Sequence, residues 1–395
     1  MILIYEFLAF GLDKLAQACA DNDYRVILFT ENPDYYQNHQ VKAIEVVHID
    51  TKNPKLVIEY INNHFDISLI KGIINSTDMF CLFGAQIAQA FNLVSNSIET
   101  LTTVRNKALL RNKCAGLDLL NVKSTQVKSF AQLKEFFLAI NKPIIFKNAS
   151  GTGSQDIYKI ANQQDLLARE PNFQDEEKQW VAEEFIHGVL YSAESISYNG
   201  KHQLLGISSR TLSHDPLFQE TSSSFPAMLP KQITQSISYY ITTLLDGVNF
   251  SHGFTHIEFM LRNNRPVLIE FNPRLGGCLT GEMLCATLGQ NIYRNMLNAC
   301  LGHNCFFEQL IFSGGASIAL LYAPTTGKIK SITGTDIISE FQDSKYYPVK
   351  TVASNILFAT DQRANYGVVY AFDLNTYLAF NKAQAIANYI SIELE

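Results

Sequence analysis

The sequence predicts an α/β and α+β fold, in which a doubly wound parallel-sheet lobe is followed by α+β lobes and an α+β extension. Over residues 1–95, apolar runs alternate with amphipathic helical spacing, which is typical of parallel strands covered by helices. From residue 157 onward the apolar runs indicate antiparallel strands. At 395 residues the chain is long for one hydrophobic core, so we expect several lobes.

The composition argues against several classes of protein. Apolar residues make up 47% and charged residues only 17%, below the roughly 25% charged residues of average soluble domains, so long disordered segments are not expected. The net charge of -6 and the lack of any run of lysine and arginine argue against a nucleic-acid partner. The seven cysteines are scattered without a C-x-x-C motif, which fits reduced thiols in a cytoplasmic protein.

The amino-terminal stretch MILIYEFLAFGLDK is apolar, but it has no basic region at its start and reaches Asp13 early. We therefore expect a strand here and not a secretory signal. No stretch of the chain approaches ~18 uninterrupted apolar residues, so we expect no membrane span.

The first 95 residues are predicted to form the wound lobe. The turn after the first strand, EFLAFGLDK, has one glycine and lacks the G-x-G-x-x-G of a dinucleotide site, so such a site is rejected. The expected strands are 2–5, 25–29, 43–49 and 67–73, and the expected helices are 12–19, 55–63 and 83–91.

The middle and end of the chain are predicted to mix strands and helices. A helix over 102–114 carries Arg105, Lys107, Arg111 and Lys113, a basic face of the kind that is usually solvated. The other expected helices are 131–141, 231–245, 282–300 and 380–389, and strands are expected at 122–127, 143–146, 157–160, 180–186, 191–197 and 203–209. A long polar loop is expected over 210–230.

Two glutamates are predicted to face each other across a hairpin. Glu258 lies in THIEFML and Glu270 in VLIEFNP, two apolar strands joined by residues 262–266. If the turn centres near Asn264, the two carboxylates are opposite each other with Cβ atoms about 5 Å apart, and Asn272 lies on the same face. A different register, with both glutamates in solvent, is the alternative.

Such a pair of like charges needs compensation, because at an effective dielectric constant near 20 the repulsion is roughly 3 kcal/mol. Either one carboxyl takes a proton or a hard cation lies between the two. The added amide oxygen of Asn272 favours the cation, since Mg²⁺ prefers oxygen ligands completed by water and phosphate.

A second candidate feature is the turn FKNASGTGSQDI, in which Lys147 precedes a run of small residues. Small residues let several backbone N–H groups converge on an anion, and a lysine adds a point charge. The pattern is not the G-x-x-x-x-G-K-[ST] loop, because the lysine precedes the glycines, and a plain flexible turn is an equal alternative. In the later stretch WVAEEFIHGVLYSAES, His187 is expected as a solvent-exposed turn residue.

Taken in order, these pieces resemble the ATP-grasp superfamily of ligases, in particular its carboxylate–amine ligases of the L-amino acid ligase-like group. The strongest motif is E-x-N-x-R-x-G-G at 270–277, and Lys107, Lys147 and Glu183 follow in the expected sequence. The stretch GGASIALLYAPTTGKIKSITG is similar to a closing segment of such ligases. The resemblance implies an ATP-grasp fold whose two α+β lobes enclose ATP. The implied domains are a wound domain over 1–95, an ATP-grasp domain over 96–300 with a small lobe at about 122–190, and a segment over 301–395 that completes the large lobe.

The resemblance also implies roles for single residues. Lys107 and Lys147 would contact the α- and β-phosphates, and Arg274 would stabilise the transferring phosphoryl group and the acyl phosphate. The closing loop would be Ser150, Gly151, Thr152, Gly153 and Ser154, the adenine-holding hinge Glu183, Glu184, Phe185 and Ile186, and the magnesium ligands Glu258, Glu270 and Asn272. Two departures stand out: Val189 and Leu190 follow the hinge glycine where the family commonly has an acidic ribose ligand, Glu194 being the next acid, and Asn148 stands where a proline is often found.

The segment 209–230 is the candidate substrate wall, because it is polar yet contains Phe218, Phe225 and Met228. In it, Arg210 is a candidate for binding a carboxylate and Glu220 for binding an amino group, while an ordinary surface loop is the alternative. Gly276 and Gly277 are expected to turn the chain away beside the crowded, charged site, where a side chain would intrude.

The activity implied is an ATP-dependent ligation: a carboxylate is activated as an acyl phosphate and joined to an amine, most simply between amino acids or a small acid and an amino acid, with release of ADP and phosphate. The implied cofactors are ATP and Mg²⁺, with Mn²⁺ as a substitute, the partners are small-molecule carboxylate and amine substrates, and a homodimer is expected. One alternative is a carboxylase or formyltransferase-like enzyme acting through carboxyphosphate or formyl phosphate. Another is a catalytically silent ATP-binding module. Arg274 argues against this alternative, because a protein that only binds ATP has less need of an arginine that stabilises the transition state.

Overall fold

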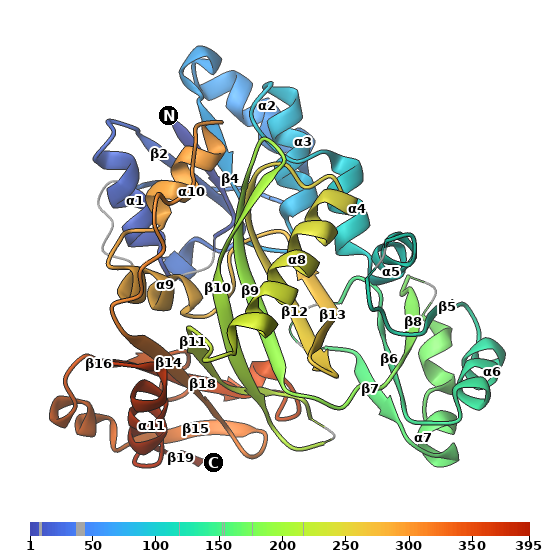
Figure 1. The fold of residues 1–395 in the computed structure, drawn as a ribbon. Coiled ribbons are helices and arrows are strands. Elements are labelled where there is room, and N and C mark those ends of the chain that lie inside the picture. Colours follow the sequence, from blue (N-terminus) through green and yellow to red (C-terminus); the bar gives the residue numbers. More distant parts are fainter. Residues whose placement is uncertain are drawn as a thin grey trace.

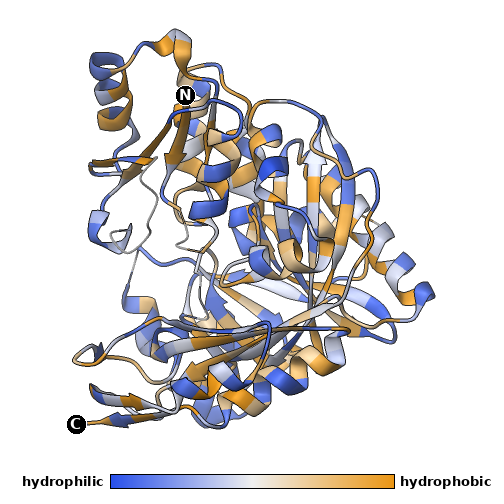
Figure 2. Ribbon diagram, turned by 90° about the vertical axis from the view of Figure 1, so that its left-hand side faces the viewer, coloured by the Kyte–Doolittle hydropathy of each residue, from blue (hydrophilic) through white to orange (hydrophobic). Residues whose placement is uncertain are grey.

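The computed structural model describes residues 1–7, 10–36, 44–117, 119–151, 153, 155–175, 177–215 and 217–395. Within these ranges the strands form four sheets, and the long strands β9 (Leu190–Tyr198) and β10 (Lys201–Leu212) run through the centre of the molecule (Figure 1). Strands and helices both carry hydrophobic and hydrophilic residues, and hydrophobic residues predominate in the strands near the amino terminus (Figure 2). No helix of the described part combines the length and hydrophobicity that crossing a membrane needs.

The amino-terminal sheet is parallel, as the sequence predicts, and its strand order is β3-β2-β1-β4. Alternate residues of its strands enter two different cores: Leu3 and Tyr5 pack with α2 and α3, whereas Ile2 and Ile4 pack with α1. The elements are β1 Ile2–Tyr5, α1 Leu12–Ala20, β2 Val26–Thr30, η1 Pro33–Tyr36, β3 Ile44–His48, α2 Pro54–His64, η2 Ile67–Leu69, β4 Gly72–Ile74 and α3 Cys81–Ala90. The strand expected over 67–73 is therefore shorter and is preceded by a 3₁₀ turn.

The helix expected over 102–114 is two helices, α4 Ile98–Arg105 and α5 Lys107–Ala115. The break is at Asn106, which has an extended backbone and whose side chain accepts hydrogen bonds from the N–H groups of the first turn of α5. The expected solvated face is also wrong for Lys107 and Arg111, which are both buried.

The small sheet is antiparallel, with order β5-β8-β6-β7. Its core includes Phe146, whose ring stacks on Trp180 with centroids 4.5 Å apart. The elements are β5 Ser124–Val127, α6 Phe130–Ile140, β6 Ile144–Asn148, β7 Ile157–Ile160, α7 Gln163–Leu167, η3 Glu170–Gln174 and β8 Trp180–Glu184.

The large sheet has the order β13-β12-β9-β10-β11-β14-β18-β16, and all neighbouring strands are antiparallel. The loop expected over 210–230 is wrong, because β10 continues to Leu212 and β11 lies between β10 and β14. Its run of serines has little intrinsic strand preference, so pairing on both sides outweighs local propensity. The further elements are β11 Glu220–Phe225, α8 Lys231–Gly247, β12 Gly253–Arg262, β13 Arg265–Asn272, β14 Gly315–Tyr322, β16 Ser344–Pro348 and β18 Asn365–Asp373.

The helix expected over 282–300 is also divided, into α9 Thr280–Leu288 and α10 Tyr293–Cys300, because Gly289 ends α9 in the left-handed conformation with φ of 62°. After α10 the chain adds β14, β16 and β18 to the large sheet, with α11 Thr376–Ala387 packed against β14 and β18. The expected final helix thus begins earlier, at Thr376. The last elements are β15 Gly327–Thr333, η4 Thr335–Glu340, β17 Asn355–Ile356, η5 Gln362–Ala364 and β19 Ser391–Leu394, of which β17, β15 and β19 form a small sheet.

Candidate active site

A cavity of about 620 Å³ lies between the small sheet, the large sheet and the loop that follows β4. The residues singled out in the sequence that line it are Lys107, Lys147, Gly151, Gly153, Glu183, Glu184, Phe185, Ile186, Arg210, Glu220, Glu258, Glu270, Asn272, Arg274 and Gly277. Ser150 and Gly276 lie beside this set but do not line the cavity, and Thr152 and Ser154 lie outside the described residues. Side chains far apart in the sequence therefore converge on one cavity.

The hairpin has the register that the sequence predicts. Glu258 pairs with Glu270, and the pairing shifts by one residue directly after Glu258. The turn consists of Asn263 and Asn264, both with positive φ (52° and 61°), which is the type I′ geometry that matches the twist of the strands. Asn272 follows on the same face, opposite His256.

Each glutamate of this pair has its own cationic partner. Glu258 forms an ion pair with Arg210, and Oε1 of Glu270 lies 2.8 Å from Nζ of Lys107. Burial by itself would raise the pKa of Glu258, but the charges of Arg210 and His256 outweigh it and hold this pKa far below its usual range. Two separate cationic side chains therefore offset the repulsion in this structure, and a cation between the carboxylates stays a prediction.

The same residues fit a hard divalent cation. Glu258, Glu270 and Asn272 all line the cavity, and they offer carboxylate and amide oxygens from adjacent positions of two paired strands. Among the described residues no group of three or more His, Cys, Asp and Glu side chains could hold a metal ion alone. A cation here would need the amide oxygen and oxygens of water or phosphate to complete its shell.

The two candidate phosphate-binding lysines are held by different partners. Nζ of Lys107 donates to the carbonyl oxygen of Gly151 at 2.7 Å, so α5 contacts the glycine-rich turn directly. Nζ of Lys147 lies 2.8 Å from Glu183. Burial lowers the pKa of Lys147 more than the neighbouring Glu183 carboxylate raises it.

Arg111 is a site residue that the sequence did not single out. It donates to Glu183 through Nε at 2.8 Å and Nη2 at 3.1 Å, and through Nη1 to the carbonyl oxygen of Leu268. Burial would raise the pKa of Glu183, but Arg111 and Lys147 overcome this and lower it to about 2. Its spacing of four residues from Lys107 could have identified it from the sequence, because this spacing places both side chains on one face of a helix.

Arg210 and Glu220, the candidate substrate residues, are paired with each other. Nε of Arg210 donates to Oε1 of Glu220 at 2.8 Å, and Nη2 donates to Oε2. Both carboxylate oxygens of Glu220 are therefore engaged. Their separate roles in binding a carboxylate and an amino group stay predictions.

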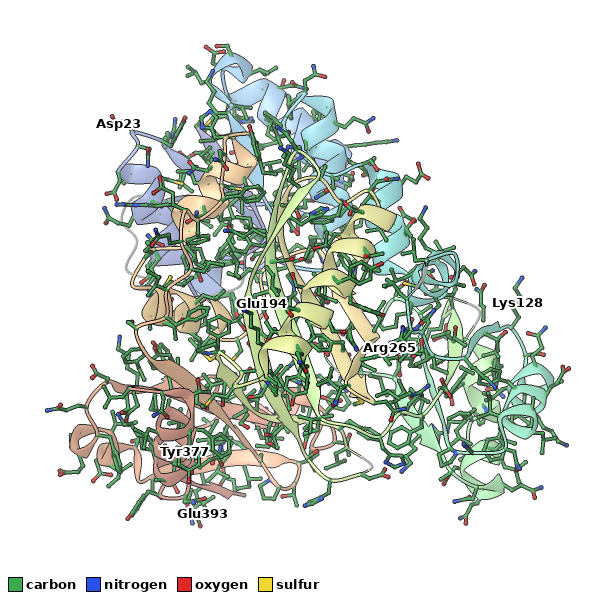
Figure 3. The ribbon with its side chains drawn as sticks, in the orientation of Figure 1. Asp23, Lys128, Glu194, Arg265, Tyr377 and Glu393 are labelled. Atoms are coloured by element: carbon green, nitrogen blue, oxygen red, sulfur yellow. The ribbon has the colours of Figure 1, made fainter. Side chains whose placement is uncertain are left out.

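His256 lies between Glu258 and Glu194, a carboxylate near the centre of the molecule (Figure 3). Its Nδ1 lies 2.6 Å from Oε1 of Glu194, and its Nε2 lies 3.4 Å from Glu258. Burial would lower the pKa of His256, but Glu194 outweighs this and raises it to about 9. Glu194 is fully buried and does not line the cavity, so it is not placed to replace the acidic ribose ligand.

Arg274 is held by a residue of the amino-terminal lobe. Its Nε donates to Oδ2 of Asp78 at 2.7 Å, its Nη2 donates to the same oxygen, and its Nη1 donates to the carbonyl oxygen of Leu275. Asp78 follows β4, at the carboxyl ends of the parallel strands, where open α/β sheets bind ligands. The position of this loop, at the carboxyl end of a predicted parallel strand, could therefore have identified it from the sequence.

The segment 209–230 does form a wall of the cavity, although as two paired strands and their connection. Of its three large apolar residues only Phe218 lines the cavity. Phe225 is fully buried in a core, and Met228 is 76% exposed. His187 is exposed as expected, but it lies at the edge of the cavity.

Residues 140–282 match the family model of the ATP-grasp domain. Among curated proteins, the chain is 24% identical over 319 residues to the uncharacterized protein y4rH of Sinorhizobium fredii (strain NBRC 101917 / NGR234). This alignment covers 78% of the chain but 65% of y4rH, so the chain spans less than two thirds of that relative.

Solved structures resemble the whole chain. The L-amino acid ligase from Bacillus licheniformis gives a TM-score of 0.87 at 18% identity, with 100% of this chain and 98% of that chain covered. The biotin carboxylase domain of the 2-oxoglutarate carboxylase from Hydrogenobacter thermophilus, in complex with MgADP, ADP and bicarbonate, gives a TM-score of 0.78 at 12% identity, covering 100% of this chain and 90% of that chain.

Proposed function

From the ATP-grasp fold that this chain has, we propose that it is an ATP-dependent carboxylate–amine ligase that forms an amide bond between amino acids, or between a small acid and an amino acid. The observation that carries the proposal is the assembly of Lys107, Lys147, the Glu258–Glu270 pair and Arg274 around one cavity. The likeness to an L-amino acid ligase over the whole chain supports the choice of amide formation.

The reaction has two steps. A carboxylate oxygen attacks the γ-phosphorus of ATP, the bond to the β-phosphate oxygen breaks, and ADP leaves an acyl phosphate. An amine then attacks the acyl carbon, loses a proton, and expels inorganic phosphate. Neither step requires a side-chain nucleophile, so catalysis rests on positioning and charge neutralisation.

The residues divide this work between them. Lys107 and Lys147 bind the phosphates, together with the glycine-rich turn that contributes Gly151 and Gly153 to the cavity. Adenine lies against the hinge Glu183, Glu184, Phe185 and Ile186. Mg²⁺ held by Glu258, Glu270 and Asn272 supplies charge neutralisation of the phosphates, a role that Mn²⁺ can share. The guanidinium of Arg274 donates to the transferring phosphoryl group and the acyl phosphate.

The structural proposal has further parts. We also propose that the chain is divided into domains over 1–95, 96–300 and 301–395. Its proposed substrates are small molecules, and we propose that it forms a homodimer in the cytoplasm. The seven free cysteines, six of them buried, support a reducing compartment.

Incubation with ATP, Mg²⁺ and pooled carboxylic and amino acids tests the proposed activity, with ADP and phosphate measured and the product weighed by mass spectrometry. The expected result is ADP and phosphate release that requires both an acid and an amine. ADP release that requires bicarbonate or formate instead would select the carboxylase or formyl phosphate alternative. ATP binding without any ADP across broad pools would contradict catalysis and leave a silent ATP-binding module.

A further inference from the structure

The loop after β4 brings into the cavity a carboxylate whose acceptor capacity is only partly used. Asp78 lines the cavity and is 8% exposed. Its Oδ2 accepts from Arg274, whereas its buried Oδ1 has no hydrogen-bond partner among the described residues. Nη1 of Arg105 lies 3.9 Å from Oδ1, beyond hydrogen-bonding distance. A buried carboxylate oxygen without a donor is unfavourable, so a ligand that supplies one is stabilised there.

The other carboxylates that line the cavity are engaged. Both oxygens of Glu220 accept from Arg210, and Glu258 and Glu270 have their own cations and the proposed metal role. Glu183 is held by Arg111 and Lys147, so among the described residues Asp78 is the remaining buried acid of the lining. Its carboxylate can turn because the terminal torsion of an aspartate is broad.

The neighbour of Asp78 determines which ligand group reaches it. Arg274 is the proposed partner of the acyl phosphate, which contains the reacting carboxyl group, and it is hydrogen-bonded to Asp78. In an α-amino acid a single carbon separates the carboxylate from the ammonium group. The two charges of the amino acid therefore complement those of the Arg274–Asp78 pair. The carboxylate lies against the guanidinium of Arg274, and the ammonium group lies beside the carboxylate of Asp78.

We propose that Asp78 binds the ammonium group of the carboxylate substrate, so that the acid activated by this enzyme is an α-amino acid and not a simple carboxylic acid. This inference rests on the proposed ligase function and deepens it. The contact is charge-assisted, and its loss is expected to weaken use of the amino acid at least about tenfold.

The test compares each amino acid with its desamino acid. Hydroxylamine replaces the amine substrate, so that only the acid varies, and ADP release is measured with L-alanine against propionate, L-leucine against 4-methylpentanoate and L-phenylalanine against 3-phenylpropanoate. In the wild type, kcat/KM is expected to favour the amino acid of the best pair at least about tenfold. Asp78→Asn, which keeps the shape and an acceptor for Arg274, is expected to bring this ratio close to one. Asp13→Asn, at an exposed position of the same lobe, is the matched control and should leave it unchanged.

Three outcomes separate the alternatives. An equal use of amino and desamino acids by the wild type would overturn the inference but leave the ligase function standing. A fall in both rates by the same factor in Asp78→Asn, with the ratio unchanged, would also overturn it, since this is what a role in holding Arg274 alone predicts. No ADP with any acid would contradict the proposed function itself, and the inference with it.

Discussion

Arg274 is the residue on which the proposed chemistry depends most. Its Nε and Nη2 are bound by Asp78, and its Nη1 donates to a backbone carbonyl. This leaves two of its five N–H groups for a phosphoryl or acyl phosphate oxygen, at a position fixed by the other three.

Replacement of this arginine should therefore affect turnover more than binding. For Arg274→Ala we expect kcat to fall by about 10²–10³ and the dissociation constant of ATP to change little, measured by ADP release and by calorimetry. Arg274→Lys keeps a positive charge beside Asp78 but loses the planar fork, and should also be impaired. The exposed Arg265→Ala, at the tip of the same hairpin (Figure 3), is the matched control. Unchanged turnover in Arg274→Ala, with weaker ATP binding, would show that the assigned role is wrong.

Glu183 gives a prediction on the pH dependence of stability. Its pKa is lowered to about 2 by Arg111 and Lys147 despite burial. A lowered carboxylate pKa stabilises the folded state fully above the unfolded value of about 4.5 and loses this effect as the pH falls toward 2. Glu183→Gln should thus cost about 3–5 kcal/mol near pH 7, because two cations stay buried without their partner.

This cost should shrink below about pH 4.5, which thermal unfolding of both proteins between pH 7 and pH 3.5 can follow. The exposed Glu59→Gln serves as the control. A difference in melting temperature that stays constant, or grows as the pH falls, would contradict the stated cause.

At the scale of single residues, the sequence predicts the acids better than their partners. The register of Glu258 and Glu270 follows from strand alternation and a two-residue turn, both local properties. The pairing of Glu258 with Arg210 brings together residues on non-adjacent strands, so no local spacing predicts it. His256 could have been found, because it lies two residues before Glu258 on the same face.

Among the secondary-structure elements, α5 matters most for the site, because its first turn carries Lys107 and its next turn Arg111. The Asn106 side chain caps this helix by accepting from Ala108 and Leu109 N–H groups at 3.0 and 3.2 Å. A polar N-cap of this kind contributes about 1 kcal/mol.

Loss of this cap should affect both stability and nucleotide binding. Asn106→Ala is expected to lower the free energy of unfolding by about 1 kcal/mol and to raise KM for ATP. Asn53→Ala is the matched control, since Asn53 caps α2 by accepting from Leu56 and lies away from the cavity. Asn53→Ala should lower the free energy of unfolding by a similar amount and leave KM for ATP unchanged. Equal KM values in the two variants would show that α5 does not position the phosphate-binding lysine.

The elements that the sequence predicted well are those whose local pattern and environment agree. The parallel strands of the first lobe and the β12–β13 hairpin are of this kind. The prediction failed where tertiary pairing outweighs propensity, as in the serine-rich β11, or where one polar side chain divides a helix, as Asn106 does between α4 and α5.

For the whole molecule, the cavity lies where three parts of the chain meet. The wound lobe contributes Asp78, the small sheet Lys147 and Glu183, the large sheet Glu258, and the loop after β13 Arg274. The sequence predicted the fold and most of the charged lining, because the motifs occur in a fixed order along the chain. It did not predict the contact between Asp78 and Arg274, which depends on how the lobes pack.

In the proposed mechanism, a carboxylate oxygen is transferred to phosphate through an acyl phosphate. Turnover of an ¹⁸O-labelled carboxylic acid substrate, with mass analysis of the released inorganic phosphate, shows whether this transfer occurs. Each phosphate is expected to carry one ¹⁸O atom, because the attacking carboxylate oxygen leaves with the phosphate when the amine displaces it. Unlabelled phosphate released during amide formation, or a label that appears in AMP, would contradict the proposed mechanism.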